Sequence, residues 1–176
     1  MLAFWRHGYA STSMKNLTTS MGLHPGSIYA AFGNKKNLFQ LALHQYEEQS
    51  QSLLLELEKK FTPRDAIFAL FDHMVADIHE HPDNCGCFLV NSMIDAAPKD
   101  EDINQSVVRA LDAFEAFCKR MIENAQKIGE IRPDLDAAKT ARILHGLIAG
   151  TRVLTRGRPD HQSAQDIADH AKSILS

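Results

Sequence analysis

Side chains that donate hydrogen bonds or positive charge are concentrated between residues 12 and 36 of this 176-residue chain. Hydroxyl, imidazole, phenol and ammonium groups bind anions, and glycine lets a backbone approach a ligand closely. In nucleic-acid recognition, such groups contact phosphate oxygens and base edges. We therefore expect the DNA-contacting residues to be Thr12, Ser13, His24, Pro25, Gly26, Ser27, Tyr29, Lys35 and Lys36.

The formal charge is distributed unevenly along the chain. Residues 1–46 contain Arg6, Lys15, Lys35 and Lys36 but no Asp or Glu, which gives this segment a net charge of +4. The other residues sum to −7, so the whole chain has a net charge of −3. A compact acid-free segment on an acidic protein is what a polyanion selects. The distribution of charge, rather than its total, therefore predicts a nucleic-acid partner.

The spacing of apolar residues predicts an all-α fold that positions these groups. Apolar residues recur at helical intervals along nearly the whole chain, and no run alternates as a strand does. Thr12 or Ser13 is expected to cap a second helix, and Pro25 to begin a third. Gly22 supplies a positive φ for the turn between them, and Leu23 packs inside that turn. The result is a helix-turn-helix, whose last helix meets base edges.

The other helices follow from the same periodicity. Gly8 is expected to end the first helix. Ile28 and Phe32 face the core of the helix-turn-helix, which leaves Tyr29 for the ligand side. The helix expected at residues 35–60 carries Leu41 in its apolar stripe. We expect further helices at residues 35–60, 64–80, 87–95, 101–128, 135–156 and 160–175, of which the last two carry small residues that permit close packing.

Two cysteines and three histidines suggest a second chemistry. Cys87 begins the helix at 87–95, where a thiol pKa is lowered, so Cys85 and Cys87 form a candidate pair for sensing oxidants or electrophiles. The alternative is that they are small buried residues, which free cysteines usually are. His73, His79 and His81 add nitrogen ligands suited to zinc or copper. Their spacing matches no structural zinc pattern, so we expect no metal and no cofactor.

Aromatic and methionine side chains predict an effector pocket in the second part of the chain. Such linings favour an apolar or aromatic small molecule. The same residues also suit an ordinary helical core, which is the more common role at each position. The candidate lining consists of Phe68, Phe71, Met74, Phe88, Met93, Phe114, Phe117 and His145.

Composition and motifs exclude several classes of protein. The chain is 44% hydrophobic and 23% charged, as globular proteins are, and no apolar run approaches the ~18 residues that span a bilayer. Arg6 and His7 end the apolar start, so no secretory signal is expected. Three cysteines do not make a disulfide framework. We expect a cytoplasmic protein without a membrane partner. The sequence contains no nucleophile elbow, P-loop, Rossmann glycine pattern or His-Glu-x-x-His motif, so we expect no enzyme.

One family resemblance covers about residues 1–45. Gly8-Tyr9 and residues 22–38 resemble the DNA-binding domain of the TetR family of transcriptional regulators; the second run reads Gly22-Leu23-His24-Pro25-Gly26-Ser27-Ile28-Tyr29-Ala30-Ala31-Phe32-Gly33-Asn34-Lys35-Lys36-Asn37-Leu38. The resemblance implies a DNA-binding domain at 1–45 and an effector-binding and dimerisation domain at 46–176. It also implies a homodimer formed by the last two helices, and a repressor that a small effector releases from a palindromic operator.

Three features depart from that family pattern. The first helix is shorter than usual, which indicates a truncated start or a weaker grip on DNA. His24 stands where Ser or Thr often caps a helix. Asn37 stands where an acidic residue often closes a capping box, so a negative charge is missing near phosphate.

Two other interpretations remain open. A plain helical hairpin also has a polar face, and the first helix is short, so the chain is alternatively a helical protein-interaction adaptor whose N-terminal module does not bind DNA. A regulator that senses redox chemistry through Cys87 is the other alternative.

Overall fold

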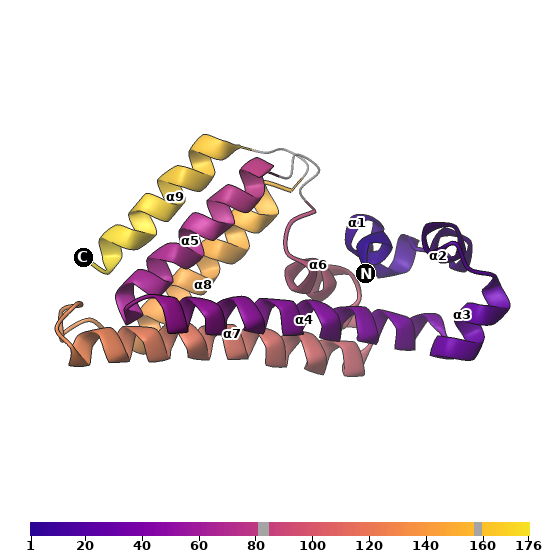
Figure 1. Cartoon of the computed structure of the whole chain (residues 1–176), viewed down its shortest axis with the longest axis horizontal. Coiled ribbons are helices and arrows are strands. Elements are labelled where there is room, and N and C mark those ends of the chain that lie inside the picture. Colours follow the sequence, from indigo (N-terminus) through magenta and orange to yellow (C-terminus); the bar gives the residue numbers. More distant parts are fainter. Residues whose placement is uncertain (81–84, 157–159) are drawn as a thin grey trace. The chain divides into compact units, whose positions relative to one another are not determined.

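The computed structural model describes residues 1–80, 85–156 and 160–176 (Figure 1). These residues form α-helices and one short 3-10 helix, η1, which confirms the all-α prediction. The elements are α1 (Leu2–Ser11), α2 (Met14–Met21), α3 (Pro25–Phe32), α4 (Lys35–Lys60), α5 (Pro63–Glu80), α6 (Phe88–Asp95), η1 (Ala97–Lys99), α7 (Glu101–Lys127), α8 (Ala137–Leu154) and α9 (His161–Ile174). No helix in the described ranges is both long and apolar enough to cross a membrane.

The chain divides into two compact units. Unit 1 contains residues 1–50 and 88–110, and unit 2 contains residues 51–87 and 111–176. Unit 1 therefore combines α1, α2 and α3 with α6, η1 and the first turns of both α4 and α7. This is a division by packing; the functional boundary after residue 45 stays a prediction.

An aromatic cluster joins α1, α4 and α6 within unit 1. Phe39 of α4 is almost fully buried and meets Phe4 of α1 edge-on, with ring centroids 5.1 Å apart. It meets Phe88 of α6 in the same way at 5.5 Å. Trp5 and Tyr46 extend the cluster, with ring centroids 5.1 Å apart. Such aromatic pairs each contribute about 0.5–1.5 kcal/mol beyond the burial of their surface. The cluster thus ties α6 to the helices of the N-terminal segment.

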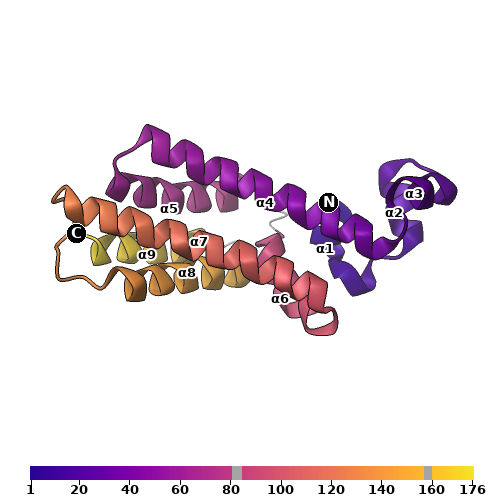
Figure 2. The same ribbon diagram turned by 90° about the horizontal axis from the view of Figure 1, so that it is seen from below.

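Unit 2 is a helical bundle with one continuous hydrophobic core. α9 lies beside α5 and α8 (Figures 1 and 2). Its Ala164, Ala168 and Ala171 share one face at helical spacing and have no exposed surface. These small side chains let the neighbouring helices approach closely. The core also contains Ile67, Phe71 and Ile78 of α5, with Cys118 and Ile122 of α7.

Ion pairs add links between the helices of unit 2. Arg120 of α7 lies 2.8 Å from Glu58 of α4. Arg152 of α8 pairs with Asp77 of α5, and Lys172 of α9 pairs with Asp72 of the same helix.

Four positions of the helix prediction need correction. Gly8 does not end α1, because helical structure resumes after it; its backbone at φ 79° instead makes a kink. Leu23 was expected inside the turn and Leu41 in the apolar stripe of α4, but both side chains are exposed. Phe32 is only half-buried, whereas Ile28 is buried as expected. The other predicted helix bounds agree with the structure to within about two residues.

Candidate nucleic-acid interface

The start of α2 is held by a capping box made entirely of neutral groups. The Ser13 hydroxyl accepts a hydrogen bond from the Asn16 backbone N–H at 3.1 Å. The Asn16 side-chain oxygen accepts one from the Ser13 backbone N–H at 2.8 Å. Ser13 is exposed, so it lies where a helix N-terminus offers backbone N–H groups to an anion.

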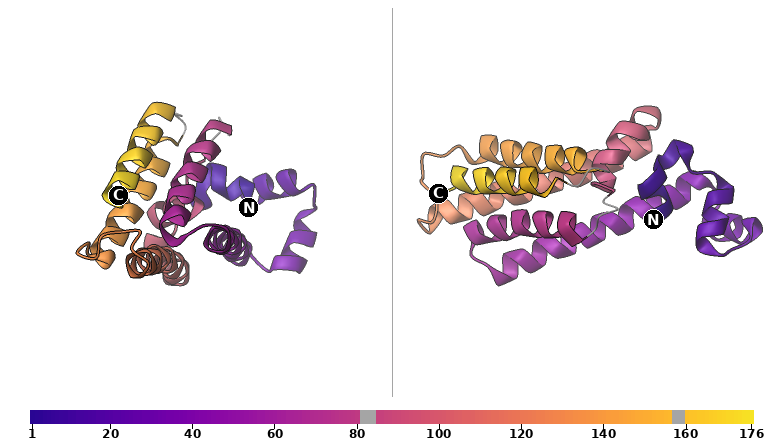
Figure 3. Two further views of the ribbon diagram at one scale, coloured as in Figure 1. Left: turned by 60° about the vertical axis from the view of Figure 1, so that its left-hand side comes forward. Right: turned by 90° about the horizontal axis from the view of Figure 1, so that it is seen from above.

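A tight turn leads from α2 to α3. Gly22 takes a left-handed conformation at φ 65°, and its N–H donates to the carbonyl of Thr18. Leu23 donates to the same carbonyl at 3.2 Å. Pro25 is the first residue of α3, where its missing N–H costs no helical hydrogen bond. The turn therefore presents the first residues of α3 as a helix-turn-helix requires; Figure 3 shows α2, the turn and α3 from above in its right-hand view.

The two faces of α3 differ sharply in exposure. Ile28 is 1% exposed and anchors the helix to unit 1, while Tyr29 is 50% exposed. His24, Pro25, Gly26 and Ser27 are also exposed. A Cβ added to Gly26 would contact nothing within 4 Å, so the backbone here borders open space. The structure thus places these predicted contact residues together at one accessible helix start.

Thr12 does not belong to this accessible set. Its side chain is buried, and its hydroxyl donates a hydrogen bond of 2.6 Å to the carbonyl of Gly8. The hydroxyl thus bonds the carbonyl four residues earlier in the chain, within the buried junction of the two helices. Thr12 therefore stabilises the junction of α1 and α2, in contrast to the predicted contact with DNA.

Lys35, the first residue of α4, has its ammonium group 4.5 Å from the centre of the Tyr9 ring. This is a cation–π contact that partly removes the group from water. Burial lowers the pKa of Lys35 from its ordinary value, and the nearby charge of Asp95 offsets part of that effect. Lys35 is half-buried as a residue, and backbone N–H groups at the start of a helix also bind anions.

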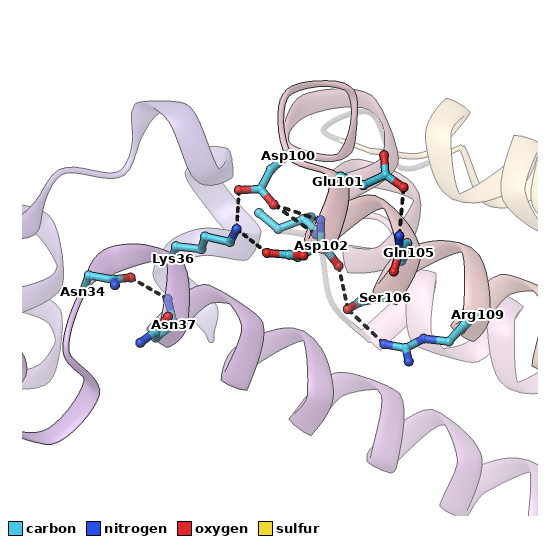
Figure 4. Close-up of polar contacts among 10 residues, drawn as sticks. Asn34, Lys36, Asn37, Asp100, Glu101, Asp102, Gln105, Ser106 and Arg109 are labelled. Carbon is cyan, nitrogen blue, oxygen red and sulfur yellow. Dashed lines mark hydrogen bonds and ion pairs between the residues drawn. The ribbon is translucent and has the colours of Figure 1, made fainter.

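Lys36 is engaged in two ion pairs (Figure 4). Its Nζ lies 2.8 Å from Oδ2 of Asp100 and 2.6 Å from Oδ2 of Asp102. The hydrogen bonds that the ammonium donates, first to Asp100 and then to Asp102, raise the pKa of Lys36 well above its ordinary value. The same contact lowers the pKa of Asp100. The prediction that Lys36 is presented to DNA thus differs from the structure, in which carboxylates of the same chain hold it.

Two further cations lie on the surface of this segment. Lys15 is exposed in the first turn of α2, and Arg6 is exposed on α1. Neither was singled out as a contact, although both contribute to the positive charge of residues 1–46. The acid-free charge count was the sequence signal that included them.

Helix caps follow the same division of charge. In residues 1–46, α2 is capped by Ser13, and Asn34 accepts a hydrogen bond of 2.9 Å from the Asn37 N–H at the start of α4. Farther along the chain, Thr62 accepts the equivalent bond at α5, and aspartates accept it at the three later helices: Asp100 at α7, Asp136 at α8 and Asp160 at α9. Asn and Asp cap helices about equally well. The helix starts near α3 are therefore stabilised without adding negative charge.

The predicted effector residues are divided between the two units. Phe71, Met74 and Phe117 lie in the core of unit 2, and Phe68 and Phe114 pack against that core. His145 lies beside Phe114, with ring centroids 5.2 Å apart, and its Nδ1 is 3.8 Å from a carboxylate oxygen of Glu115. Phe88 and Met93 belong to unit 1, where Phe88 is part of the aromatic cluster. The structure does not bring all eight residues to one site within a unit.

A small hollow opens between α8 and α9, away from those residues. Its volume is about 160 Å³, and Thr151, Leu154, Thr155, Asp160, Ser163, Ala164 and Ile167 line it. The Asp160 carboxylate is already bonded to the N–H and hydroxyl of Ser163. The hydroxyls of Thr151 and Thr155 donate to carbonyls of their own helix, so these groups are not aimed at a ligand.

The cysteines and histidines do not form a described metal centre. Cys85 and Cys87 lie half-buried just before α6. His79 stacks on His161, with ring centroids 3.8 Å apart, and His73 is exposed. His81 lies outside the described residues. Among residues 1–80, 85–156 and 160–176, no three or more His, Cys, Asp or Glu residues are grouped to hold a metal ion.

Two family models match the chain. One, described as bacterial regulatory proteins of the tetR family, matches residues 3–42. The other, described as a tetracyclin repressor-like C-terminal domain, matches residues 63–171. The second match includes residues 88–110, which pack in unit 1.

Two curated bacterial proteins resemble the chain over most of its length. The HTH-type transcriptional repressor ComR of Escherichia coli is 27% identical over 172 residues, covering 96% of this chain and 81% of ComR. The uncharacterized HTH-type transcriptional regulator YezE of Bacillus subtilis is 26% identical over 174 residues, covering 98% of this chain and 90% of YezE.

Solved structures share the fold. A cysteine mutant of the TetR family regulator CifR, complexed with a 26-base-pair operator DNA, superimposes with a TM-score of 0.87 at 23% identity, covering 99% of this chain and 92% of CifR. The reduced form of Escherichia coli NemR gives a TM-score of 0.88 at 18% identity, covering 98% and 91%.

Proposed function

Because the chain belongs to the TetR family of bacterial regulatory proteins, we propose that it is a dimeric repressor that a small effector releases from a palindromic operator. The chain is a transcription regulator and not an enzyme. The observation that carries the proposal is the exposed, acid-free start of α3 beside neutral helix caps. The solved complex of CifR with operator DNA and the repressor role of ComR support it.

The proposed contacts divide into two classes. Ser13 and Lys15 lie at the start of α2, and Tyr29 lies on the exposed face of α3. All three are suited to phosphate, which fixes orientation. His24 and Ser27 stand at the start of α3, where side chains of a helix-turn-helix reach base edges. Pro25 and Gly26 lie between them. Gly26 has no side chain, so DNA can approach the backbone closely here.

The start of α4 supplies a further phosphate contact. Backbone N–H groups at a helix N-terminus bind anions, and the partly desolvated Lys35 ammonium lies close to that position. We leave Thr12 out of the proposed contacts because its side chain is buried.

Salt-dependent binding tests this function. Fluorescence anisotropy of a labelled duplex from the DNA flanking the chain's own gene is compared with a scrambled duplex of the same composition. We expect tighter binding to the native duplex, with affinity falling steeply as salt rises. Ser27→Ala should reduce the preference between duplexes. Lys15→Ala should weaken binding to both duplexes, and reduce the salt slope by ~0.9 for each lost phosphate contact.

A matched control separates local contact from total charge. Lys119→Ala removes an exposed lysine of unit 2 that pairs with Glu123, and should leave both affinities nearly unchanged. Equal binding to the two duplexes, or affinity that does not respond to salt, would contradict the proposal and favour the adaptor alternative.

The homodimer is proposed to form through α8 and α9. α8 exposes large apolar side chains, among them Ile143, Val153 and Leu154. Gly146 and Gly150, on the same helix, are exposed and have open space where a Cβ would lie. Apolar and small residues together suit close packing against a second copy. Two-fold symmetry then presents two copies of α3 to a palindromic site.

The effector is proposed to bind at the edge of the core of unit 2. Phe68 and Phe114 are partly buried there, with Phe71, Met74 and Phe117 behind them in the core. His145 and Glu115 supply a polar pair beside Phe114. Such a mixture favours an apolar or aromatic ligand with one polar group. A ligand found bound in this unit away from these side chains would contradict this placement.

A further inference from the structure

The segment that links α6 to α7 brings carboxylates against the DNA-binding helices of unit 1. Asp95, the last residue of α6, accepts a hydrogen bond of 3.2 Å from the backbone N–H of Ala10, just beyond the kink of α1. Asp100 and Asp102 lie at the start of α7 and hold Lys36. An acid-free segment thus folds together with acidic residues from later in the chain.

Lys36, Asp100 and Asp102 form a cluster, the Lys36 cluster, that reverses the local charge. One ammonium group faces two carboxylates, so the three side chains together have a formal charge of −1 instead of the +1 of a free lysine. Two of the three ammonium protons are directed to Asp100 and Asp102. The Lys36 side chain is still 33% exposed, so solvent and other anions can reach it.

Asp100 is held in place independently of Lys36. Its Oδ1 accepts hydrogen bonds from the backbone N–H groups of Asp102 at 3.1 Å and Ile103 at 3.3 Å. The carboxylate therefore caps α7 with one oxygen and binds Lys36 with the other. Asp102 is 68% exposed, and its carboxylate depends on Lys36 for this contact. Asp100 is thus fixed by α7, whereas the long lysine side chain is the mobile partner.

We propose that Asp100 and Asp102 compete with the DNA backbone for Lys36, so that the start of α7 is an intramolecular inhibitor of DNA binding. Lys36 is the second residue of α4, directly after the helix-turn-helix and next to the N–H groups proposed to bind phosphate. A phosphate at this position must displace the carboxylates or accept their repulsion. Any ligand that prefers the paired state of Lys36 lowers DNA affinity, and any that prefers the open state raises it. This inference rests on the proposed DNA-binding function.

Conservative substitutions release Lys36 without removing the cap of α7. Asn caps a helix as well as Asp does, so Asp100→Asn keeps the acceptor for Ile103. Anisotropy with the native and scrambled duplexes compares the wild type with Asp100→Asn/Asp102→Asn. We expect several-fold tighter binding to both duplexes at low salt. The salt slope should steepen by up to ~0.9 per protomer, since each freed Lys36 gains one phosphate contact.

Two controls make the dependence on Lys36 decisive. In a Lys36→Met background, Asp102→Asn should give no more gain than Glu101→Gln does, because only the general loss of negative charge then remains. Glu101→Gln removes one negative charge from the same turn of α7, but Glu101 binds Gln105 at 3.0 Å and not Lys36. It should give a smaller gain than Asp102→Asn alone, and that gain should persist in the Lys36→Met background.

Each contrary outcome has a separate meaning. Weaker binding by Asp100→Asn/Asp102→Asn would overturn the inference, because the cluster would then position α4 for DNA instead of opposing it. A gain from Glu101→Gln equal to that from Asp102→Asn, or an Asp102→Asn gain that Lys36→Met does not reduce, would overturn it in favour of general electrostatics. If the double variant loses helical circular dichroism, Asp102→Asn alone decides, because that side chain is exposed. Failure of every variant and the wild type to bind DNA would instead reject the proposed function itself.

Discussion

Burial divides the three cysteines into two chemical classes. Cys118 of α7 has no exposed surface, and loss of hydration, aided by the charge of Glu115, raises the pKa of its thiol to about 12. The thiolate is the reactive form, so Cys118 is protonated and inert at neutral pH. Cys85 and Cys87 retain solvent contact. Any thiol chemistry of the folded chain therefore belongs to these two.

Alkylation followed by peptide mass spectrometry tests that division. In the native protein at neutral pH, iodoacetamide should modify Cys85 and Cys87 and leave Cys118 largely unmodified. All three should react in denaturant, which serves as the control for reagent and peptide recovery. Fast modification of Cys118 in the native protein would show that the reagent reaches this thiol, which would contradict its burial in the core of unit 2. For the redox alternative, an unchanged response to oxidants in Cys87→Ser would end that hypothesis.

Neighbouring residues with similar side chains show where sequence reasoning stops. Thr12 and Ser13 were both candidates to cap α2 and to contact phosphate. Only Ser13 caps α2 and stays exposed, whereas Thr12 is buried and its hydroxyl bonds the carbonyl of Gly8. The pairing of Lys36 was also not predictable, since its partner Asp102 is 66 positions away in the sequence. The sequence identifies the polar side chains of this segment, but contacts with distant parts of the chain decide which of them are accessible.

Among the elements, the long helices followed best from the sequence. α4 has the predicted bounds of 35–60 because its apolar positions repeat over many turns and a proline follows its end. Shorter pieces depended on packing: α1 continues past Gly8, and a Cβ at that glycine would lie 2.7 Å from a carboxylate oxygen of Asp95. Such a contact between α1 and α6 has no local signal. The start and stop of a helix are thus easier to predict than its kinks.

The neutral cap of α4 gives a prediction at the scale of elements. Asn34→Asp should keep the cap and leave the melting temperature unchanged or slightly higher, since a negative charge at a helix N-terminus contributes about 0.3–1 kcal/mol. DNA affinity should nevertheless fall at low salt, because a carboxylate then stands next to the proposed phosphate site. Calorimetry and anisotropy measure the two effects.

The reciprocal substitution at α8 is the control for that prediction. Asp136→Asn makes the opposite change at a cap that holds the N–H of Lys139 at 2.9 Å in unit 2. It should change neither DNA affinity nor its salt dependence. If Asn34→Asp bound DNA as tightly as the wild type at low salt, the start of α4 would not be near phosphate.

For the whole molecule, the division into units separates two tasks. Unit 1 contains the helix-turn-helix and the acidic segment that opposes it, while unit 2 contains the helices proposed to dimerise. A symmetric operator needs two copies of α3, so the binding free energy of the dimer depends on contacts in unit 2 that never touch DNA. Assembly and DNA affinity should therefore change together.

Analytical ultracentrifugation tests the proposed dimer surface. Leu154 is 66% exposed at the end of α8, and Ile143→Asp/Leu154→Asp should shift the chain from dimer to monomer and sharply weaken binding to the native duplex. Ile94→Asp replaces another exposed apolar residue, on α6 of unit 1, and should leave the dimer intact. Dimers that survive the double substitution would place the interface elsewhere.

The single tryptophan of the chain turns the aromatic cluster into a built-in optical probe. Trp5 packs edge-on against Tyr46 and lies 6.2 Å from Phe88 by ring centroid, all within unit 1. Its emission therefore reports on how α1, α4 and α6 stay joined, and unit 2 contributes no indole signal. Far-ultraviolet dichroism follows the helices of both units. Recording the two signals during one melt would reveal whether the units lose structure in one transition or in sequence.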